Sequence, residues 1–216
     1  MIGNVIVLDN PLAKYYLTIL RNRETPPSVF REYMYRLGFI LGYETSRFIN
    51  WEKIVVETPL ALANGLKPSG KVIIVGILGA SIPLVNGMWR AIPWASLGLV
   101  AARRIEMENS VEVKVYYERL KDDLSGFTAI IGDPMLATGS TISAVIEKLV
   151  ARGCSKVIVA SVIASKQGIE YVLGKFRDIN IITVDIDPQL NNKFFIVPGL
   201  GDAGDRSLDG NGGLDI

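Results

Sequence analysis

Histidine is absent from this sequence of 216 residues, and cysteine occurs once, as Cys154. The absence of histidine excludes a Ser-His-Asp triad, a Cys-His pair, histidine-ligated zinc and acid–base catalysis by imidazole. A single cysteine excludes an internal disulfide, and its setting, Arg152–Ser155, predicts a helix-end or turn residue in a reducing cytoplasm. Any catalysis must therefore use carboxylates, cations, backbone dipoles or a bound divalent ion.

Long apolar runs and a charge excess are also missing. The sequence is 49% hydrophobic, yet no run approaches the ~18–20 residues of a membrane span. Its 23 basic and 22 acidic residues give a net charge of +1, which offers no electrostatic argument for nucleic acid or an acidic membrane. The segment Met1–Lys14 has no basic region and no small-residue cleavage site, so we expect no signal peptide. The high apolar fraction suggests an oligomer.

Short apolar segments alternate with amphipathic ones along the chain. This pattern predicts an α/β fold, with a mostly parallel central sheet covered by helices on both faces, as one domain over residues 1–206. The expected helices are 11–21, 29–49 (capped by Ser28), 83–90, one beginning near 142, and 168–175. The expected strands are 51–57, 71–78, 97–101, 127–131, 157–163 and 179–184.

The remaining segments have other patterns. Residues 62–70 are expected to form a loop. Residues 104–120 alternate in character and predict an exposed β-hairpin arm that turns at Asn109-Ser110. Residues 185–206 are irregular and are expected to form a hood over the sheet, and the Gly/Asp/Asn-rich residues 207–216 are expected to be disordered.

The stretch Ala129–Thr141 (AIIGDPMLATGST) joins a strand-like run to a loop of small residues and then to a helical pattern. Free N–H groups and hydroxyls at such a helix N-terminus favour phosphate. An ordinary strand–turn–helix corner with Ser140 or Thr141 as N-cap would give the same spacing. Asp133 favours the phosphate site, because a plain cap needs no acid directly before the loop. The loop is neither a Walker nor a dinucleotide motif.

A second segment, Pro198–Arg206 (PGLGDAGDR), is rich in glycine. Its glycines allow the backbone to approach a flat ligand edge, and Asp202 and Asp205 add carboxylates for sugar hydroxyls or, through water, Mg²⁺. A flexible surface loop is the alternative interpretation. The apolar residues Phe194–Val197 are expected to be buried and to anchor the segment.

Two further features stand where strands are expected to end. The small residues Gly79–Ser81 follow the strand 71–78, and ligands of α/β sheets bind at the carboxyl ends of strands. Arg103 and Arg104 are candidate anion ligands, although paired arginines also occur at solvated edges and interfaces.

Together, DPMLATGST (Asp133–Thr141) and PGLGDAGDR (Pro198–Arg206) resemble the uracil phosphoribosyltransferase family. The first segment alone indicates only a phosphoribosyltransferase, whereas the second is similar to the family's uracil-recognition segment. The resemblance covers almost the whole chain. It also includes Arg21, Phe30-Arg31, Glu57-Thr58-Pro59, Arg104-Ile105-Glu106, Tyr116–Leu120 and Ile186-Asp187 with Leu190-Asn191.

The resemblance implies a type I phosphoribosyltransferase fold and a salvage reaction with Mg²⁺. Uracil and 5-phosphoribosyl-1-pyrophosphate (PRPP) would give UMP and pyrophosphate through an oxocarbenium-like transition state at ribose C1′. Such chemistry requires positioning, metal neutralisation and dipoles rather than a strong base. The resemblance further implies a homodimer or homotetramer in which the hairpin arm embraces a second subunit. It also implies GTP or CTP as effectors, for which no residue suggests a site.

The resemblance also assigns roles to residues. Ala137–Thr141 would hold the 5′-phosphate, Asp133 the ribose hydroxyls, Asp202 the ribose or the metal–pyrophosphate, and Arg104 the pyrophosphate. Asp133, Asp202 and Arg104 are the implied catalytic residues. The implied PRPP contacts are Asp133, Pro134, Met135, Leu136, Ala137, Thr138, Gly139, Ser140, Thr141, Gly79, Arg104 and Asp202. The implied uracil contacts, largely through backbone groups, are Ile196, Gly201, Asp202 and Ala203.

Three positions depart from the family pattern. Leu78-Gly79-Ala80 stands where the family has Leu-Arg-Ala, Asn86 replaces an acid, and Phe195 replaces a tyrosine. Losing a cation at the leaving group would remove about 2–4 kcal/mol of transition-state stabilisation unless another cation compensates. The alternative hypothesis is therefore a nucleotide sensor that binds UMP or PRPP with weak or no turnover. A transferase for another base is disfavoured by PGLGDAGDR, and RNA binding by the balanced charge.

Overall fold

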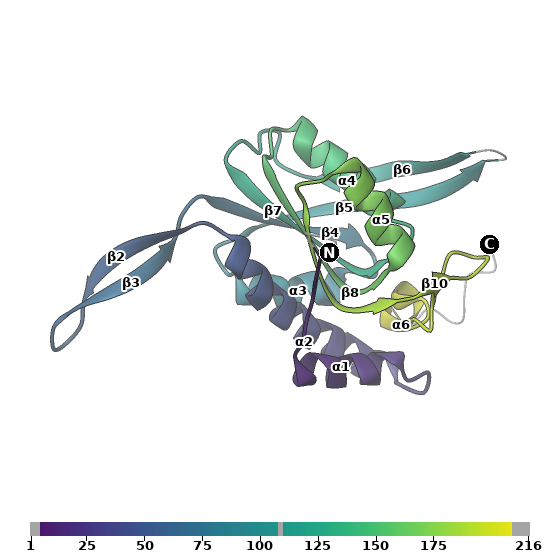
Figure 1. Cartoon of the computed structure of the whole chain (residues 1–216), viewed down its shortest axis with the longest axis horizontal. Helices are drawn as coiled ribbons and strands as arrows, with labels where there is room; N and C mark the ends of the chain where they lie inside the picture. The colour runs from purple at the N-terminus through teal and green to yellow at the C-terminus, as the bar shows by residue number, and fades with distance from the viewer. Residues whose placement is uncertain (1–4, 108–109, 209–216) are drawn as a thin grey trace.

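A seven-stranded sheet forms the centre of the computed structural model, which describes residues 5–107 and 110–208 (Figure 1). All its neighbouring strands are parallel except the last pair, which is antiparallel. The predicted α/β fold with a mostly parallel sheet is confirmed. The strands, in spatial order, are β1 (Val5–Val7), β9 (Asn180–Asp187), β8 (Lys156–Ser165), β7 (Phe127–Leu136), β4 (Lys71–Leu78), β5 (Ser96–Met107) and β6 (Ser110–Arg119).

Helices cover both faces of this sheet (Figure 1). The helices α1 (Pro11–Arg21), α2 (Pro27–Thr45) and α3 (Ile82–Ala91) lie on one face, and α4 (Ser140–Ala151) and α5 (Lys166–Lys175) lie on the other. Successive residues of a strand serve the two faces alternately, so Ile130 packs toward α2 and Ile131 toward α4. Because both faces are covered, β4 and β8 are apolar along nearly their whole length.

Glycines bring α2 and α3 into close contact. A Cβ on Gly38 would lie 2.0 Å from the carbonyl oxygen of Leu84, and one on Gly87 would lie 2.0 Å from that of Tyr35. The two helix backbones therefore touch at these positions. This contact fixes the layer of helices that lies beneath β4 and β7.

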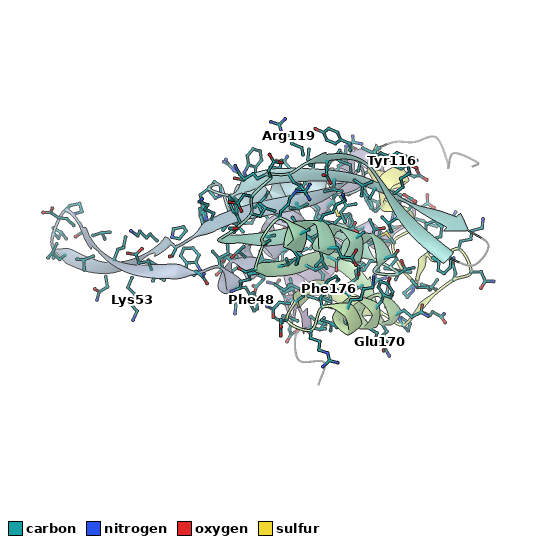
Figure 2. All side chains as sticks on the ribbon, turned by 90° about the horizontal axis from the view of Figure 1, so that it is seen from above. Phe48, Lys53, Tyr116, Arg119, Glu170 and Phe176 are labelled. Atoms are coloured by element: carbon teal, nitrogen blue, oxygen red, sulfur yellow. The ribbon has the colours of Figure 1, made fainter. Side chains whose placement is uncertain are left out.

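A hairpin of β2 (Trp51–Glu57) and β3 (Leu62–Pro68) extends away from the sheet (Figures 1 and 2). The loop predicted over residues 62–70 is therefore wrong. The two strands pair over seven residues of each and form a sheet of their own. Solvent reaches both sides of this hairpin, so its sequence lacks the alternation by which a half-buried strand is recognised.

The hairpin predicted over residues 104–120 is present, but it belongs to the main sheet. Strand β5 does not end at residue 101; it continues through Arg103 and Arg104, which pair with Lys114 and Val113 of β6. The predicted turn at Asn109-Ser110 includes residue 109, which lies outside the described residues. The hairpin is therefore the edge of the sheet, prolonged beyond its body (Figure 1).

Several boundaries differ from the prediction. Ser28 lies inside α2, whose N-cap position is Pro26, and the helix ends at Thr45 before a 3-10 turn, η1 (Ser46–Phe48). Residues 185–206 are more regular than predicted. Ser207, expected in a disordered tail, is buried, whereas residues 209–216 lie outside the described part. The added elements are β10 (Gln189–Leu190), β11 (Ile196–Val197) and α6 (Ala203–Leu208).

Across residues 5–107 and 110–208, no helix is both long enough and apolar enough to span a membrane.

Candidate functional site

The strands β4 and β7 are neighbours from which the chain continues in opposite directions. After β4 it proceeds to β5 and β6 on one side, and after β7 to β8 and β9 on the other. Pairing between β4 and β7 stops at Gly76 and Gly132, beyond which β4 pairs only with β5 and β7 only with β8. The carboxyl ends of the two strands are thus no longer paired to each other. Such a switch point is where α/β sheets bind ligands.

Asp133 and Pro134 belong to strand β7, which continues beyond the strand predicted over residues 127–131. Proline cannot donate to a strand ladder, but Pro134 lies beyond the last residue that pairs with β4. On the other side the register with β8 continues from Asp133–Ser161 to Met135–Ile163. The absence of a partner strand on one side permits the proline and leaves Asp133 at the edge of the opening.

The loop after β7 leads directly into α4. Gly139 is the N-cap residue, so the alternative of an ordinary corner capped by Ser140 or Thr141 is wrong. The φ of Gly139, 80°, lies in the left-handed region, and the residue at the cap position makes no side-chain hydrogen bond to the helix. The loop is held from behind, because Ser165 Oγ donates to the carbonyl of Ala137 and accepts from the N–H of Gly168. In the first turn of α4 the Ser140 N–H donates to Thr138 Oγ1 at 3.4 Å, and Gly139, Thr141 and Ile142 line the opening, so the N-terminus of the helix faces it, an arrangement that favours an anion.

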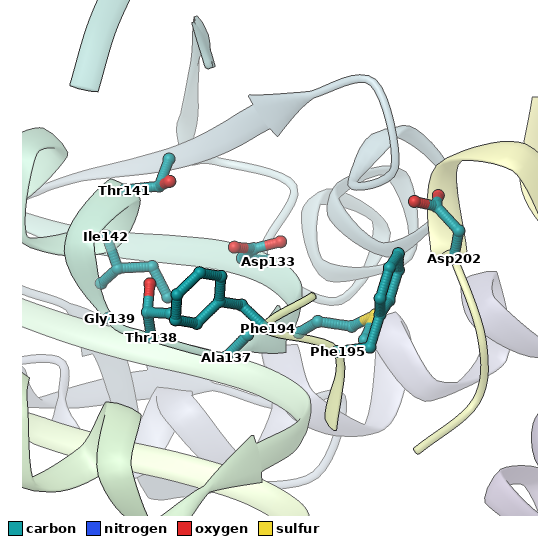
Figure 3. Close-up of a pocket in the computed structure, with 10 residues that line it drawn as sticks. Asp133, Ala137, Thr138, Gly139, Thr141, Ile142, Phe194, Phe195 and Asp202 are labelled. Atoms are coloured by element: carbon teal, nitrogen blue, oxygen red, sulfur yellow. The ribbon is translucent and has the colours of Figure 1, made fainter. Parts of the chain in front are cut away.

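A cavity of about 180 Å³ opens at this point (Figure 3). Asp133 and Asp202 are the two carboxylates of its wall, and no lysine or arginine is among its lining residues. Figure 3 shows the loop residues Thr138 and Gly139 on one side of Asp133 and Asp202 on the other. The lining residues are Asp133, Met135, Ala137, Thr138, Gly139, Thr141, Ile142, Phe194, Phe195 and Asp202.

The carboxyl group of Asp133 is half-buried at the cavity wall. Desolvation raises its pKa to about 7, and the hydrogen bond from the backbone N–H of Met135 only partly opposes this. None of the described side chains supplies a compensating cation, and partners that donate hydrogen bonds would stabilise the charged form of the carboxylate. Hydroxyl groups of a ligand are such donors.

Other implied site residues do not line the cavity. Leu136, Ile196 and Ala203 are buried in the hydrophobic core, and Pro134 is buried as well, so only their backbone groups remain as candidates. Gly201 is exposed with a φ of 78°. Ser140 is half-buried, and its Oγ lies 2.9 Å from Thr138 Oγ1. The side chain of Arg104 lies outside the described part of the structure; only its place on β5 is known.

Gly79 lies beside the C-terminal helix. A Cβ on Gly79 would lie 3.1 Å from Leu208 Cδ1 and would meet no other atom within 4 Å. A Cβ on Gly204 would lie 3.9 Å from Cβ of Ala80 and 3.1 Å from Asp202 Oδ1. The loop after β4 is therefore adjacent to the Asp202 side of the cavity, although it does not line the cavity.

Three lining residues were not among the predicted ones: Ile142, Phe194 and Phe195. The phenylalanines were expected to be buried, but they are 38% and 37% exposed, and their rings lie over the cavity (Figure 3). They follow β10, just before β11, and the backbone of Phe194 has a φ of 59°. An exposed aromatic pair beside a glycine-rich segment was the signal available in the sequence.

Arg206 anchors the glycine-rich segment to the helical layer. Its guanidinium lies 4.4 Å from the ring centroid of Phe30 and donates to the carbonyl oxygens of Leu200, Asn22 and Leu20. Asp202 Oδ1 accepts the N–H of Asp205 at 3.0 Å and so caps α6. The interpretation of this segment as a flexible loop is therefore wrong.

The family model described as uracil phosphoribosyltransferase matches residues 7–208. The chain belongs to the uracil phosphoribosyltransferase family. The curated uracil phosphoribosyltransferase of Aeropyrum pernix is 46% identical, over 94% of this chain and 95% of its own length. That of Pyrobaculum arsenaticum is 48% identical, over 94% of this chain and 98% of its own length. The predicted family and enzyme class, a pentosyltransferase, are confirmed.

Solved structures agree with the fold. A protein from Aquifex aeolicus superposes with a TM-score of 0.85 at 30% identity, over 94% of this chain and 97% of that one. A hypoxanthine phosphoribosyltransferase from Staphylococcus aureus has a TM-score of 0.51 at 13% identity, over 79% and 85% of the two chains. The second likeness concerns the fold alone, which is of the type I phosphoribosyltransferase kind.

Proposed function

We propose that this chain transfers the phosphoribosyl group of PRPP to uracil, giving UMP and pyrophosphate. The observation that supports this most directly is one cavity lined both by the acid and small-residue loop of β7 and α4 and by Asp202 of the PGLGDAGDR segment. The alternative of a nucleotide sensor has no support, because the curated relatives are named as transferases.

In this proposal the N–H groups and hydroxyls of Ala137–Thr141 bind the 5′-phosphate at the N-terminus of α4. Asp133 accepts hydrogen bonds from the ribose hydroxyls, which favours its charged form despite its burial. Asp202 faces the ribose or the pyrophosphate from the opposite side of the cavity (Figure 3). Holding the sugar at two ends aligns C1′ with the incoming nitrogen, which is the contribution that this chemistry most needs.

The base would be read by the backbone around Ile196, Gly201 and Ala203. Uracil presents one N–H donor between two carbonyl acceptors, a pattern that fixed backbone groups can match. The exposed ring of Phe195 supplies an apolar wall beside this segment. A transferase for adenine or guanine would need a different set of contacts to the edge of the base. Measuring turnover of PRPP with adenine or guanine in place of uracil tests that alternative.

Magnesium fits this cavity only as a partner of the substrate. Among residues 5–107 and 110–208, no three histidine, cysteine or acidic side chains come together as a metal site. Mg²⁺ typically binds one or two carboxylates together with phosphates and waters, and Asp202 would be its carboxylate through water. When bound, the ion neutralises charge on the leaving pyrophosphate.

Gly79 and Arg104 are the two positions that bear on how the protein binds the leaving pyrophosphate. Gly79 supplies no cation, and we assign the pyrophosphate contact to Arg104 as a proposal. The test is incubation with PRPP, Mg²⁺ and radiolabelled uracil, comparing the natural chain with Gly79→Arg. The Cβ of the added side chain would meet the end of the Leu208 side chain, at 3.1 Å. We expect UMP from both proteins. No UMP from the natural chain alongside turnover by Gly79→Arg would refute the proposal.

We further propose that the chain forms a homodimer through the β2–β3 hairpin rather than through residues 104–120. A two-stranded hairpin is marginally stable in water, yet this one exposes a row of apolar side chains. Leu60 is 97% exposed, and Val55, Leu62 and Leu66 are also exposed. Sedimentation of Leu60→Ser/Leu66→Ser, with Lys53→Ser as the control on the same hairpin, should show dissociation only of the leucine variant. Unchanged sedimentation of both would exclude this interface.

Regulation by GTP or CTP stays a proposal, which is tested by adding each nucleotide to the activity assay.

A further inference from the structure

Gly199 is held on both sides by one pair of charged residues. Its N–H donates to Asp187 Oδ2 at 2.9 Å, and its carbonyl oxygen accepts from Arg21 Nη1 at 2.9 Å. Arg21 is the last residue of α1, and Asp187 is the last residue of β9. Two elements far apart in the sequence thus converge on the first glycine of the PGLGDAGDR segment.

The geometry of the pair is bidentate. Arg21 Nη1 lies 2.8 Å from Asp187 Oδ2, and Arg21 Nη2 lies 2.7 Å from Asp187 Oδ1. The side chain of Asp187 is 5% exposed and that of Arg21 is 22% exposed. The hydrogen bond to Asp187 raises the pKa of Arg21 further above its already high value. Two parallel charge-assisted bonds in a nearly dry site give a fixed direction as well as attraction.

The segment needs such support because its backbone is unusually free. Gly199 has a φ of 62°, and a Cβ there would lie 2.1 Å from the carbonyl oxygen of Ile196, so no other residue fits. Gly201, with a φ of 78°, follows two positions later. Glycines lose the most conformational freedom on ordering, so an unsupported segment would sample many conformations. Arg206 fixes the far end of this segment, and the Arg21–Asp187 pair fixes the near end.

We propose that Arg21 and Asp187 are positioning residues that set the backbone of residues 199–201 for recognition of the base. This rests on the proposed function of that segment. Neither residue lines the cavity beside the phosphate loop, so neither is expected to contact PRPP. Replacing these residues should therefore weaken the use of uracil and leave the binding of PRPP unchanged. The reason is that recognition by backbone groups depends on the placement of those groups within fractions of an ångström.

The experiment compares Arg21→Met, Asp187→Leu and the double variant Arg21→Met/Asp187→Leu. Arg21→Met leaves the buried Asp187 carboxylate without its ion-pair partner, and Asp187→Leu leaves Arg21 with Asp185 as its remaining carboxylate partner. Each single variant should lose stability, whereas the double variant removes the pair as a whole and should recover much of it. Lys14→Met is the control, because Lys14 binds the Val184 carbonyl and Asp185, a carboxylate that also accepts from Arg21, but does not touch Gly199.

We expect kcat/KM for uracil to fall on the order of 10- to 100-fold in the double variant, with KM for PRPP within about twofold of the natural value. The control should change neither. If the pair were merely structural, the double variant would regain uracil kinetics together with stability, and that result would overturn the proposal. Equal losses for uracil and PRPP would overturn it too.

Amide hydrogen exchange supplies a measurement that does not depend on catalysis. In the double variant, exchange at residues 199–201 should quicken about tenfold or more while the strands of the sheet keep their protection. Unchanged exchange at those residues would refute the positioning role even if the natural chain formed no UMP. Absence of UMP with quickened exchange would instead refute the proposed function and leave the pair as a device that orders this segment.

Discussion

Replacing Asp133 with asparagine should stabilise the folded protein at neutral pH while weakening its site. The unfolded chain releases the Asp133 proton near the ordinary pKa of 3.8, whereas the folded chain holds it up to about pH 7. The free energy of unfolding must therefore fall as pH rises between those values and level off above them. An asparagine has no proton to release, so the variant escapes this loss.

The magnitude follows from the shift from 3.8 to about 7 and from the exposure of the carboxylate. Each tenfold change in proton affinity corresponds to about 1.4 kcal/mol, which gives a ceiling of about 4 kcal/mol. Because Asp133 is only half-buried and lines an open cavity, we expect about half of that, roughly 2 kcal/mol. For a chain of this length the melting temperature would rise by about 4–8 °C.

The assay is urea unfolding of both proteins without ligands, at one protein concentration, near about pH 4.5 and about pH 8. The variant should be the more stable protein at the higher pH, and the difference should shrink toward zero at the lower one. Asp202→Asn is the control, because its carboxylate is exposed and an asparagine can still cap α6. A difference that is the same at both pH values, or a variant less stable near pH 8, would refute the reasoning.

Four further outcomes are expected. Gly38→Ala should lower the free energy of unfolding by about 2 kcal/mol or more, because α3 leaves no space for a Cβ. Gly174→Ala in α5 is the control: its Cβ would meet no atom within 4 Å, so it should raise the free energy of unfolding by about 0.5 kcal/mol in the same urea titration. Gly139→Ala should raise KM for PRPP and cost about 1–3 kcal/mol, because its φ is positive and its Cβ would lie 2.8 Å from the Gly168 carbonyl oxygen. Lys148 and Arg152 both form ion pairs with Glu118, and Lys148 contributes most to lowering the pKa of Glu118, so Glu118→Gln should cost less than about 1 kcal/mol near neutral pH and less still as pH falls through that lowered pKa. Chelation of Mg²⁺ should weaken PRPP binding at least about tenfold in calorimetry and leave UMP binding nearly unchanged, because UMP has no pyrophosphate to share the metal.

The sequence was sufficient where burial decides the structure. Strands β4 and β8 are apolar runs because helices cover both faces, and their prediction needed no knowledge of their neighbours. Strand β3, with sequence LANGLKP, gave no such signal. It is exposed on both sides and contains Gly65 and Pro68, so only its pairing with β2 makes it a strand. That pairing exists only in the folded structure and cannot be predicted from the local sequence pattern.

The candidate site was predictable in its loops and less so in its strand. Local chemistry indicated the small-residue loop before α4, but the strand was predicted to end at residue 131, before Asp133-Pro134, because Asp-Pro normally begins a turn. Whether Pro134 can stay in β7 depends on where β4 stops pairing, which is known only once the sheet is assembled. The exposed rings of Phe194 and Phe195 were missed for a related reason: apolar residues are expected inside, and a ligand wall is the exception.

The charge of the cavity wall connects these observations. Among the described side chains, two carboxylates and no cation line the cavity, so a bare phosphate would be repelled by Asp133 and Asp202 and attracted by the N–H groups of α4. A substrate that brings a metal ion with its pyrophosphate and donates hydrogen bonds from its ribose hydroxyls removes this repulsion. Asp202 then gains the metal as a partner, and Asp133 gains the hydroxyls. Gly79 therefore does not by itself argue against turnover. In this arrangement a metal that arrives with the substrate adds positive charge at the leaving group to the contact proposed for Arg104, and the fold supplies the placement.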